Sequence, residues 1–140
     1  MKKMKNIKYS FGLVALTLAL SLVFVSCRKN EKKIEKWIVG TWELDRYLQQ
    51  DYKDGELVDE SESTDQGKVQ FNKDGTGEDI GGNFIGGDFE WSNTDETLTL
   101  ITGAGSTIYD IDEFSESKFV FSLTDANGND KFVERWYLSK

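Results

Sequence analysis

Apolar residues recur at every second position over most of the chain after Gly40. Phe89 and Trp91 alternate with Asp88 and Glu90, and similar alternation returns in several later segments. Successive side chains of a strand point to opposite faces, so a period of two predicts strands with one buried face. The predicted strands lie near residues 40–50, 67–72, 75–80, 84–92, 97–103, 106–114, 118–124 and 131–138, with a weaker pattern at 56–60.

Short turn sequences separate these predicted strands. Asp54-Gly55, Asp74-Gly75 and Asn127-Gly128 are pairs favoured where a tight hairpin needs a positive φ. Such short connections join antiparallel neighbours, and a meander with one apolar face tends to close because open strand edges invite aggregation. The pattern predicts an all-β fold, a single antiparallel up-and-down (meander) β-barrel of about eight strands.

Two details of this expectation concern the first strand and the residues before it. In the first strand, Trp42, Leu44 and Leu48 alternate with Glu43, Asp45 and Tyr47. Before it, Ile34, Trp37 and Ile38 recur at spacings of three and four residues, which predicts a short N-terminal helix within residues 31–39 that covers one end of the barrel.

The N-terminal segment has the layout of a bacterial lipoprotein signal. Lysines near the start precede an uncharged apolar run from Phe11 to Val25, and the small residue Ser26 stands directly before Cys27, the only cysteine. As a helix this run would span about 22 Å, whereas a bilayer core needs about 30 Å. A lipid anchor at Cys27 is therefore favoured over a transmembrane signal anchor or a buried structural cysteine, although both alternatives stay open.

The chain is thus expected to have three parts. Residues 1–26 form a signal peptide, residues 27–39 carry the lipidated cysteine, a basic tether and the short helix, and residues 40–140 form the barrel domain. Because Arg28, and not an aspartate, follows the cysteine, the expected location is the outer membrane of a Gram-negative bacterium, with palmitate or a similar acyl chain as the anchor.

Charge divides the chain at the same place. The formal net charge is −8, yet the basic residues Arg28, Lys29, Lys32 and Lys33 cluster after the cysteine, while residues 38–140 hold eight basic and 23 acidic residues. A basic tether suits an anionic headgroup layer, and an acidic body disfavours nucleic acid as a partner. The alternative is that the acidic body is only an ordinary solvated surface.

The sequence offers few residues that could take part in catalysis. The chain has no histidine, and its single cysteine is assigned to lipid. No serine stands in a Gly-x-Ser-x-Gly elbow, and zinc would have to rely on carboxylates alone. We therefore predict no enzyme activity, no catalytic residue, no cofactor and no metal site.

Three polar or glycine-rich segments have ordinary interpretations. The oxygen-rich stretch Asp125–Asp130 lacks the spacing and terminal Glu of a calcium loop and is expected to be a hairpin turn. The carboxylates Asp110, Asp112 and Glu113 are expected on a solvated surface. The glycine-rich segment Gly81–Gly87 is expected at the barrel rim, either as a plain loop or as one that gates the mouth.

Several motifs together resemble a known family. The opening Val39–Leu44, the hairpin Phe71–Gly77, the segment Phe89–Leu100 and the closing Glu134–Leu138 are similar to the lipocalin-like domain of small bacterial lipoproteins. The resemblance implies an up-and-down barrel in which the structural motif residues Gly40 and Trp42 lie at the closed end, with Arg135 over the indole of Trp42. The chain departs from typical lipocalins because it is shorter, lacks their disulfide and has no helix after the last strand.

Two functions of different class follow from this resemblance and from the acidic body. The first is a membrane-anchored lipoprotein that binds a small hydrophobic ligand inside the barrel, with six candidate ligand-binding residues: Trp42, Phe71, Trp91, Leu100, Phe121 and Trp136. The second is an interaction or structural lipoprotein with a packed barrel core and an unknown protein partner. An open interior cavity of about 300 Å³ or more would favour the first.

Overall fold

The computed structural model describes residues 33–140, so the predicted signal segment and Cys27 lie outside the described residues. A short helix covers residues 33–38. Nine antiparallel strands follow: β1 (Gly40–Lys53), β2 (Glu56–Thr64), β3 (Lys68–Phe71), β4 (Thr76–Ile80), β5 (Asp88–Asn93), β6 (Thr97–Thr102), β7 (Gly105–Phe114), β8 (Lys118–Asn127) and β9 (Asp130–Ser139). From residue 33 to residue 140, no helix has the length and apolar character needed to cross a bilayer.

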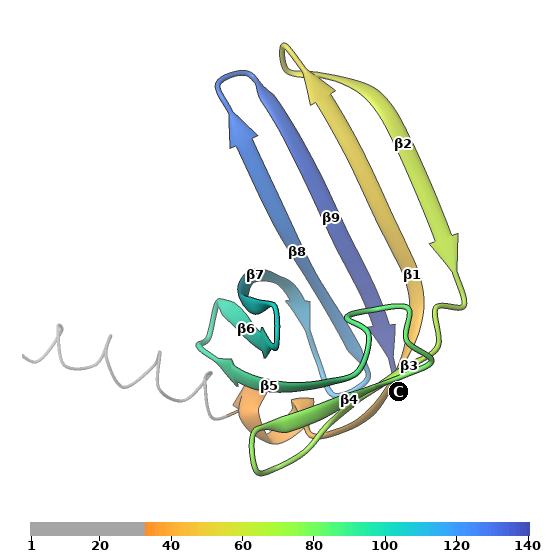
Figure 1. Cartoon of the computed structure of the whole chain (residues 1–140), viewed down its shortest axis with the longest axis vertical. Helices are drawn as coiled ribbons and strands as arrows, with labels where there is room; N and C mark the ends of the chain where they lie inside the picture. The colour runs from red at the N-terminus through yellow and green to blue at the C-terminus, as the bar shows by residue number, and fades with distance from the viewer. Residues whose placement is uncertain (1–32) are drawn as a thin grey trace, which may run out of the picture.

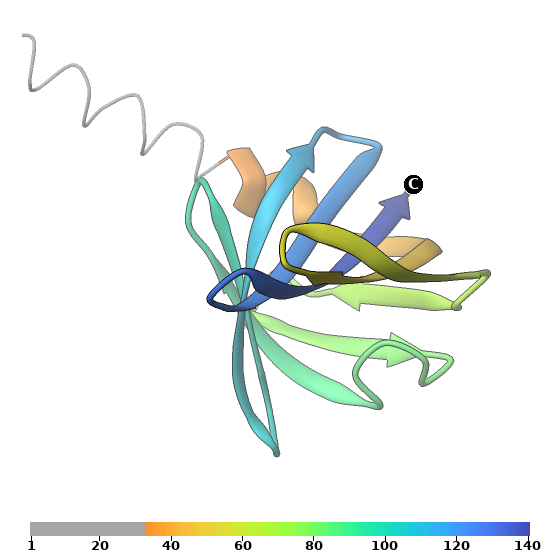
Figure 2. The same ribbon diagram turned by 90° about the horizontal axis from the view of Figure 1, so that it is seen from above.

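Strand β1 closes the sheet into a barrel. Its first four residues pair with β3, its second half pairs with β2, and its other edge pairs with β9 from Glu43 to Tyr52. Because β3 to β9 follow one another as neighbours, β1 and β3–β9 make a closed eight-stranded meander, and β2 is one additional strand (Figures 1 and 2). The predicted all-β antiparallel barrel with a short N-terminal helix is confirmed.

Strands β1, β2, β8 and β9 rise well beyond the other strands of the barrel (Figure 1). We call their projecting part, residues 46–64 and 123–135, the extension. The ladder between β7 and β8 ends at Ser122, so β8 continues upward with β9 as its remaining partner among the described strands. The end of the barrel beneath the extension, where the β4–β5 connection lies, is called the mouth.

The opposite end of the barrel is closed by the helix. Ile38 is fully buried, and its carbonyl accepts a hydrogen bond of 2.8 Å from the indole N–H of Trp42. The ring of Trp42 also packs against those of Phe114 and Phe119, with centroids 6.2 and 5.8 Å away. These contacts satisfy the one polar atom of a buried tryptophan and fix the helix across the barrel floor.

The cation over Trp42 is Lys140, not the expected Arg135. The ammonium of Lys140 lies 4.4 Å from the centre of the indole and donates to the carbonyls of Trp37 and Val39 at 2.8 and 2.9 Å. Arg135 points to the outer face of β9, where its Nε lies 3.0 Å from Asp112. Arg135 alternates with Trp136 along the strand, so its side chain leaves on the side opposite the core.

Strand β1 departs from the predicted alternation after Leu44. A bulge between Leu44 and Arg46 inserts one residue, so Tyr47 pairs with Trp136 and points inward while Leu48 pairs with Arg135 and points outward. The expectation that Leu48 shares a face with Trp42 was therefore wrong. A one-residue shift moves every later side chain to the other face of the sheet.

Two predicted strand boundaries also differ from the structure. The strand expected at 84–92 begins only at Asp88, because residues 81–87 form a loop. The weak pattern at 56–60 belongs to the longer strand β2, whose nine residues are all exposed. A strand without a buried face has no period of two in its hydrophobicity, which explains the weak signal.

We expect Lys140→Met to lower the free energy of unfolding by about 1 kcal/mol, because it removes two charge-assisted hydrogen bonds that hold the helix end. This value is reduced from that of two buried bonds because the ammonium is partly exposed to solvent. Urea denaturation measures the change. The matched variant Lys118→Met, which removes an exposed ion pair with Glu113 of 2.9 Å, should cost less than about 0.5 kcal/mol. Equal losses in the two variants would contradict the role given to Lys140.

Candidate functional site

The six sequence-predicted ligand-binding residues lie in the core of the barrel. All six are buried. Phe71 meets Trp91 edge-on at 5.7 Å, and Phe119, which is not one of the six, lies 5.0 Å from Phe121 and 5.8 Å from Trp42. The indole N–H of Trp91 is satisfied by the carbonyl of Thr76 at 2.9 Å. Trp42, Phe71, Trp91 and Leu100 therefore pack the body of the barrel, whereas Phe121 and Trp136 reach its mouth.

A hollow of about 620 Å³ on the protein lies outside the barrel. It is lined by side chains of β4, β5 and β6 that include Glu78, Glu90 and Ile101, which point away from the core. Its position on the outer face of the sheet separates it from the six predicted residues. At the mouth, in contrast, aromatic and polar side chains lie together with two of the six residues.

The loop over residues 81–87 folds across the mouth and inserts the ring of Phe84. That ring meets Trp136 edge-on at 4.7 Å and lies 5.8 Å from Phe121. Gly81, Gly82, Gly86 and Gly87 all have positive φ, which lets the chain turn sharply on both sides of Phe84. We call the surface formed by Trp136 and Phe121 under this ring the aromatic seat.

Asp79 holds the loop in place from the end of β4. Its side chain is only 6% exposed, and its Oδ2 accepts backbone N–H bonds from Phe84, Ile85 and Gly86 at 2.9, 2.9 and 2.8 Å. Three donors converging on one carboxylate oxygen make a strong local clamp. The second oxygen, Oδ1, is buried and has no hydrogen-bond partner among the described residues. A buried acceptor without a donor is costly and marks this position as unusual.

A polar pair lies beside the aromatic seat. Tyr47 stacks on Trp136 with ring centroids 4.1 Å apart, and its hydroxyl donates to the carboxylate of Glu134. The side-chain amide of Gln49 approaches the same oxygen at 3.4 Å. Burial first and the Glu134 carboxylate second raise the pKa of Tyr47 above its ordinary value, and burial likewise raises the pKa of Tyr109.

Carboxylates continue from this pair up the inner wall of the extension. Phe132 on β9 is flanked by Asp51 on β1 and Asp125 on β8, its direct partners in the two ladders. These residues, with Asp130, help to line a small hollow of about 210 Å³. Within residues 33–140, no group of three or more potential ligands is placed to hold a metal ion. The mouth therefore offers an aromatic floor below an acidic wall.

Two of the three expected polar or glycine-rich segments belong to this site, because Asp125 and Asp130 line its upper wall and the loop over residues 81–87 covers the aromatic seat, whereas Asp112 and Glu113 lie on the outer surface. Asp125–Asp130 ends in a two-residue hairpin turn between β8 and β9, as predicted. Asp112 and Glu113 make surface ion pairs with Arg135 and Lys118. Gly81–Gly87 lies at the rim, as expected.

Sequence reasoning missed most of the polar groups of the mouth. Tyr47 was assigned to the outer face because the bulge that turns it inward has no glycine or proline signal. Asp79 resembles any exposed strand carboxylate in the sequence, although the glycine-rich segment that follows it supplies the backbone donors, from Phe84, Ile85 and Gly86. Comparison of the chain with models of known protein families and with curated proteins finds no match.

We expect the stability of the protein to fall as the pH rises above about 10, because a tyrosine in the unfolded chain loses its proton there while Tyr47 in the folded chain keeps its own. The folded state then binds more protons than the unfolded state, so alkali favours unfolding. For one tyrosine the slope is at most about 1.4 kcal/mol per pH unit, reduced by solvent screening at this half-buried site.

Urea denaturation of the Tyr47→Phe variant at several alkaline pH values tests this expectation. The slope should become shallower without vanishing, because Tyr109 contributes in the same direction. Glu134→Gln should have a smaller effect than Tyr47→Phe, since burial is the larger cause of the shift. An unchanged slope in Tyr47→Phe would contradict the assignment.

Proposed function

We propose that the protein is a non-catalytic, lipid-anchored binding protein of the cell envelope, similar to lipocalin-like lipoproteins, whose ligand is a small amphipathic molecule bound at the mouth. The observation that carries this proposal is the insertion of Phe84 into the aromatic seat by a glycine-rich loop. The ring occupies the place where an apolar ligand would contact the barrel, and glycines on both sides allow the loop to move away.

The polar surroundings of the seat specify the other end of the ligand. Asp79 Oδ1 is a buried acceptor without a donor, and Glu134 lies beside the seat. A ligand with an apolar group of about the size of a phenyl ring and a positively charged or hydrogen-bond-donating group matches both features. An anionic amphiphile would meet the acidic wall above and is disfavoured. These features favour a binding site at the mouth over one deep in the packed body.

Phe121 and Trp136 are the two sequence-predicted residues that this proposal retains as direct ligand contacts. Trp42, Phe71, Trp91 and Leu100 would support the seat from below. The ring contacts of Trp42, Phe71 and Trp91 keep the floor rigid, so the part of the ligand that enters the seat is limited to the volume that Phe84 vacates.

The test uses an unlipidated chain that begins at residue 27 and carries Cys27→Ser. We expect decylamine to quench its tryptophan fluorescence at a concentration about tenfold lower than decanoate, which has the same chain length, because the seat is surrounded by carboxylates. Phe84→Ala empties the seat and should tighten decylamine binding by about threefold, since the loop ring no longer competes. Fluorescence titration below the micelle concentration measures both effects.

Ile108→Ala, which shortens an exposed side chain on the outer face of β7, serves as the matched control and should leave binding unchanged. Equal quenching by the amine and the acid, or the same response of Phe84→Ala and Ile108→Ala, would contradict a site at the mouth.

The anchor is proposed from the sequence and has a separate test. Cells given radiolabelled palmitate should label the full chain, and Cys27→Ala should lose the label and leave the membrane fraction, because the thiol is the acylated group. Ser26→Ala keeps a small residue before the cysteine and should remain labelled. Labelling that persists in Cys27→Ala would contradict the anchor.

An interaction lipoprotein with a packed core is the second candidate function. It is favoured by the extension, because β2 exposes all nine of its residues and adds nothing to the buried core. A surface of this kind is suited to contact a macromolecule, whereas the mouth is suited to a small one.

A further inference from the structure

The outer edge of β2 exposes the backbone of a long strand. Within residues 33–140, β2 pairs with β1 alone and stands at the end of the strand order. In an antiparallel pair, alternate residues direct their N–H and C=O groups away from the partner strand, so the outer edge of β2 carries a row of such groups. The strand from Glu56 to Thr64 is exposed throughout and contains no proline.

The side chains of β2 give this edge a strong negative charge. Glu56, Asp59, Glu60 and Glu62 lie on the strand, and it has no lysine or arginine. Pairing of β2 with β2 of a second copy would bring like charges into direct opposition, which disfavours a dimer through this edge. Leu57 and Val58 are 48% and 55% exposed and add apolar surface near the start of the strand.

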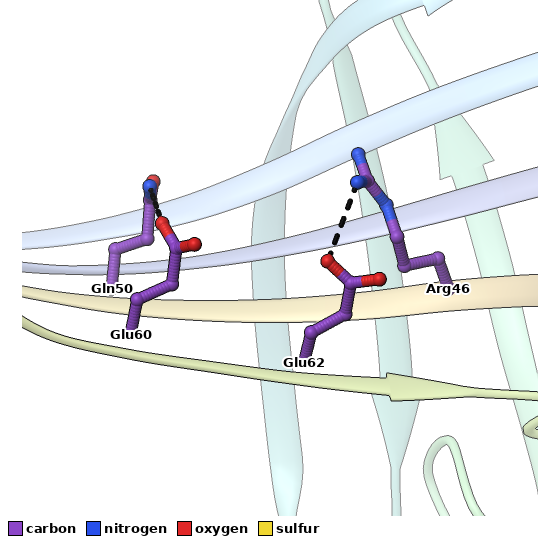
Figure 3. Close-up of polar contacts among 4 residues, drawn as sticks. All are labelled: Arg46, Gln50, Glu60 and Glu62. Atoms are coloured by element: carbon purple, nitrogen blue, oxygen red, sulfur yellow. Dashed lines mark hydrogen bonds and ion pairs between the residues drawn. The ribbon is translucent and has the colours of Figure 1, made fainter.

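Neighbours within the chain neutralise this charge only in part. Arg46 of β1 approaches Glu62 at 3.5 Å, and the side-chain amide of Gln50 donates to Glu60 at 2.7 Å (Figure 3). Arg46 also lies 3.8 Å from the ring centre of Tyr137, so its guanidinium is shared with β9. The N–H of Glu60 donates to the Asp59 carboxylate at 3.0 Å, a contact along β2 itself that an incoming strand would replace.

We propose that β2 binds an extended, lysine- or arginine-rich segment of another protein, which adds to its outer edge as a further strand. Main-chain hydrogen bonds would supply affinity, and basic side chains at alternate positions would face the carboxylates of β2. This site goes beyond the proposed ligand at the mouth and rests on different residues, so either one can fail without the other.

The upper part of β8 is a second exposed strand edge in the extension and can be compared with the edge of β2. Beyond Ser122, where its pairing with β7 ends, β8 continues only to Asn127 and carries the single charged residue Asp125. The edge of β2 is longer and has four carboxylates, so a basic strand is expected there and not on β8.

The test uses the full chain in a non-ionic detergent and three synthetic ten-residue probes with a fluorescent label. A Lys-Val repeat can form a basic strand. A Lys-Pro repeat has equal charge but lacks every second N–H group and cannot add to a sheet. A Glu-Val repeat keeps the strand propensity and reverses the charge.

Fluorescence anisotropy should show the Lys-Val probe binding about tenfold more tightly than either of the others. The double variant Glu60→Gln and Glu62→Gln preserves side-chain shape and should weaken Lys-Val binding by about fivefold. The matched double variant Glu96→Gln and Glu116→Gln, at turns near the closed end, should bind as the wild type does. Circular dichroism verifies that both variants retain the strand signal.

Position is tested by a photo-reactive phenylalanine placed at Ser61 of β2 or at Ala126 of β8. Crosslinking of the Lys-Val probe to position 61 and not to position 126 supports the proposal. Equal binding of the Lys-Val and Lys-Pro probes would show that charge alone causes the binding and would overturn strand addition. Crosslinking only at position 126, or dimerisation of the protein by itself through position 61, would overturn the assignment to β2.

Discussion

The pairing of β1 on both of its edges is the constraint on which the rest of the structure depends. One edge pairs with β3 from Gly40 to Glu43 and then with β2 from Arg46 to Lys53, while the other pairs with β9 almost throughout. The lower half of β1 therefore closes the barrel and its upper half builds the extension. At the change of partner, the N–H of Leu44 donates to the carbonyl of Gly67 and the N–H of Gln66 donates to the carbonyl of Leu44. The bulge at the same place turns Tyr47 into the mouth, so sheet topology and the candidate site share one cause.

The sequence predicted the barrel because its lower strands bury one face each. Trp42 and Leu44 on β1, and Phe89 and Trp91 on β5, occupy alternate positions, and that spacing follows directly from burial on one side of a pleated strand. The extension breaks this relation, since β2 buries neither face and leaves no periodic signal. The mouth was less accessible to sequence reasoning, because the clamp formed by Asp79 depends on backbone N–H groups of residues five to seven positions later. Backbone donors have no sequence signature of their own.

The extension is held by contacts across strands instead of by a second layer. A single-layer sheet usually needs a helix or another sheet against one face to be stable. Here the strands are rooted in the barrel, and rings support them on both faces: Tyr47 stacks on Trp136 inside, while Arg46 covers Tyr137 and Lys131 covers Tyr52 outside. Leu48 and Val133 are also buried, although neither belongs to the core cluster of the barrel. Such local support leaves the outer edge of β2 open to solvent.

The arrangement of the two ends gives the proposed anchor a geometric consequence. The described part of the helix that covers the closed end starts at Lys33, and Cys27 lies six residues before Lys33 in the sequence. Six residues of extended chain reach at most about 20 Å, so a lipid on Cys27 would keep Lys33 within that distance of the membrane surface. Lys33, Lys36 and Lys140 lie in or beside this end, whereas Asp51, Asp125 and the carboxylates of β2 lie on the extension. Glu96 and Glu116 at the turns of the closed end offset the attraction of these lysines to an anionic membrane surface, whereas the carboxylates of the extension would be repelled by it. With the proposed anchor, the short tether and this repulsion would orient the extension away from the bilayer, so that the mouth and the edge of β2 could be reached from the aqueous side.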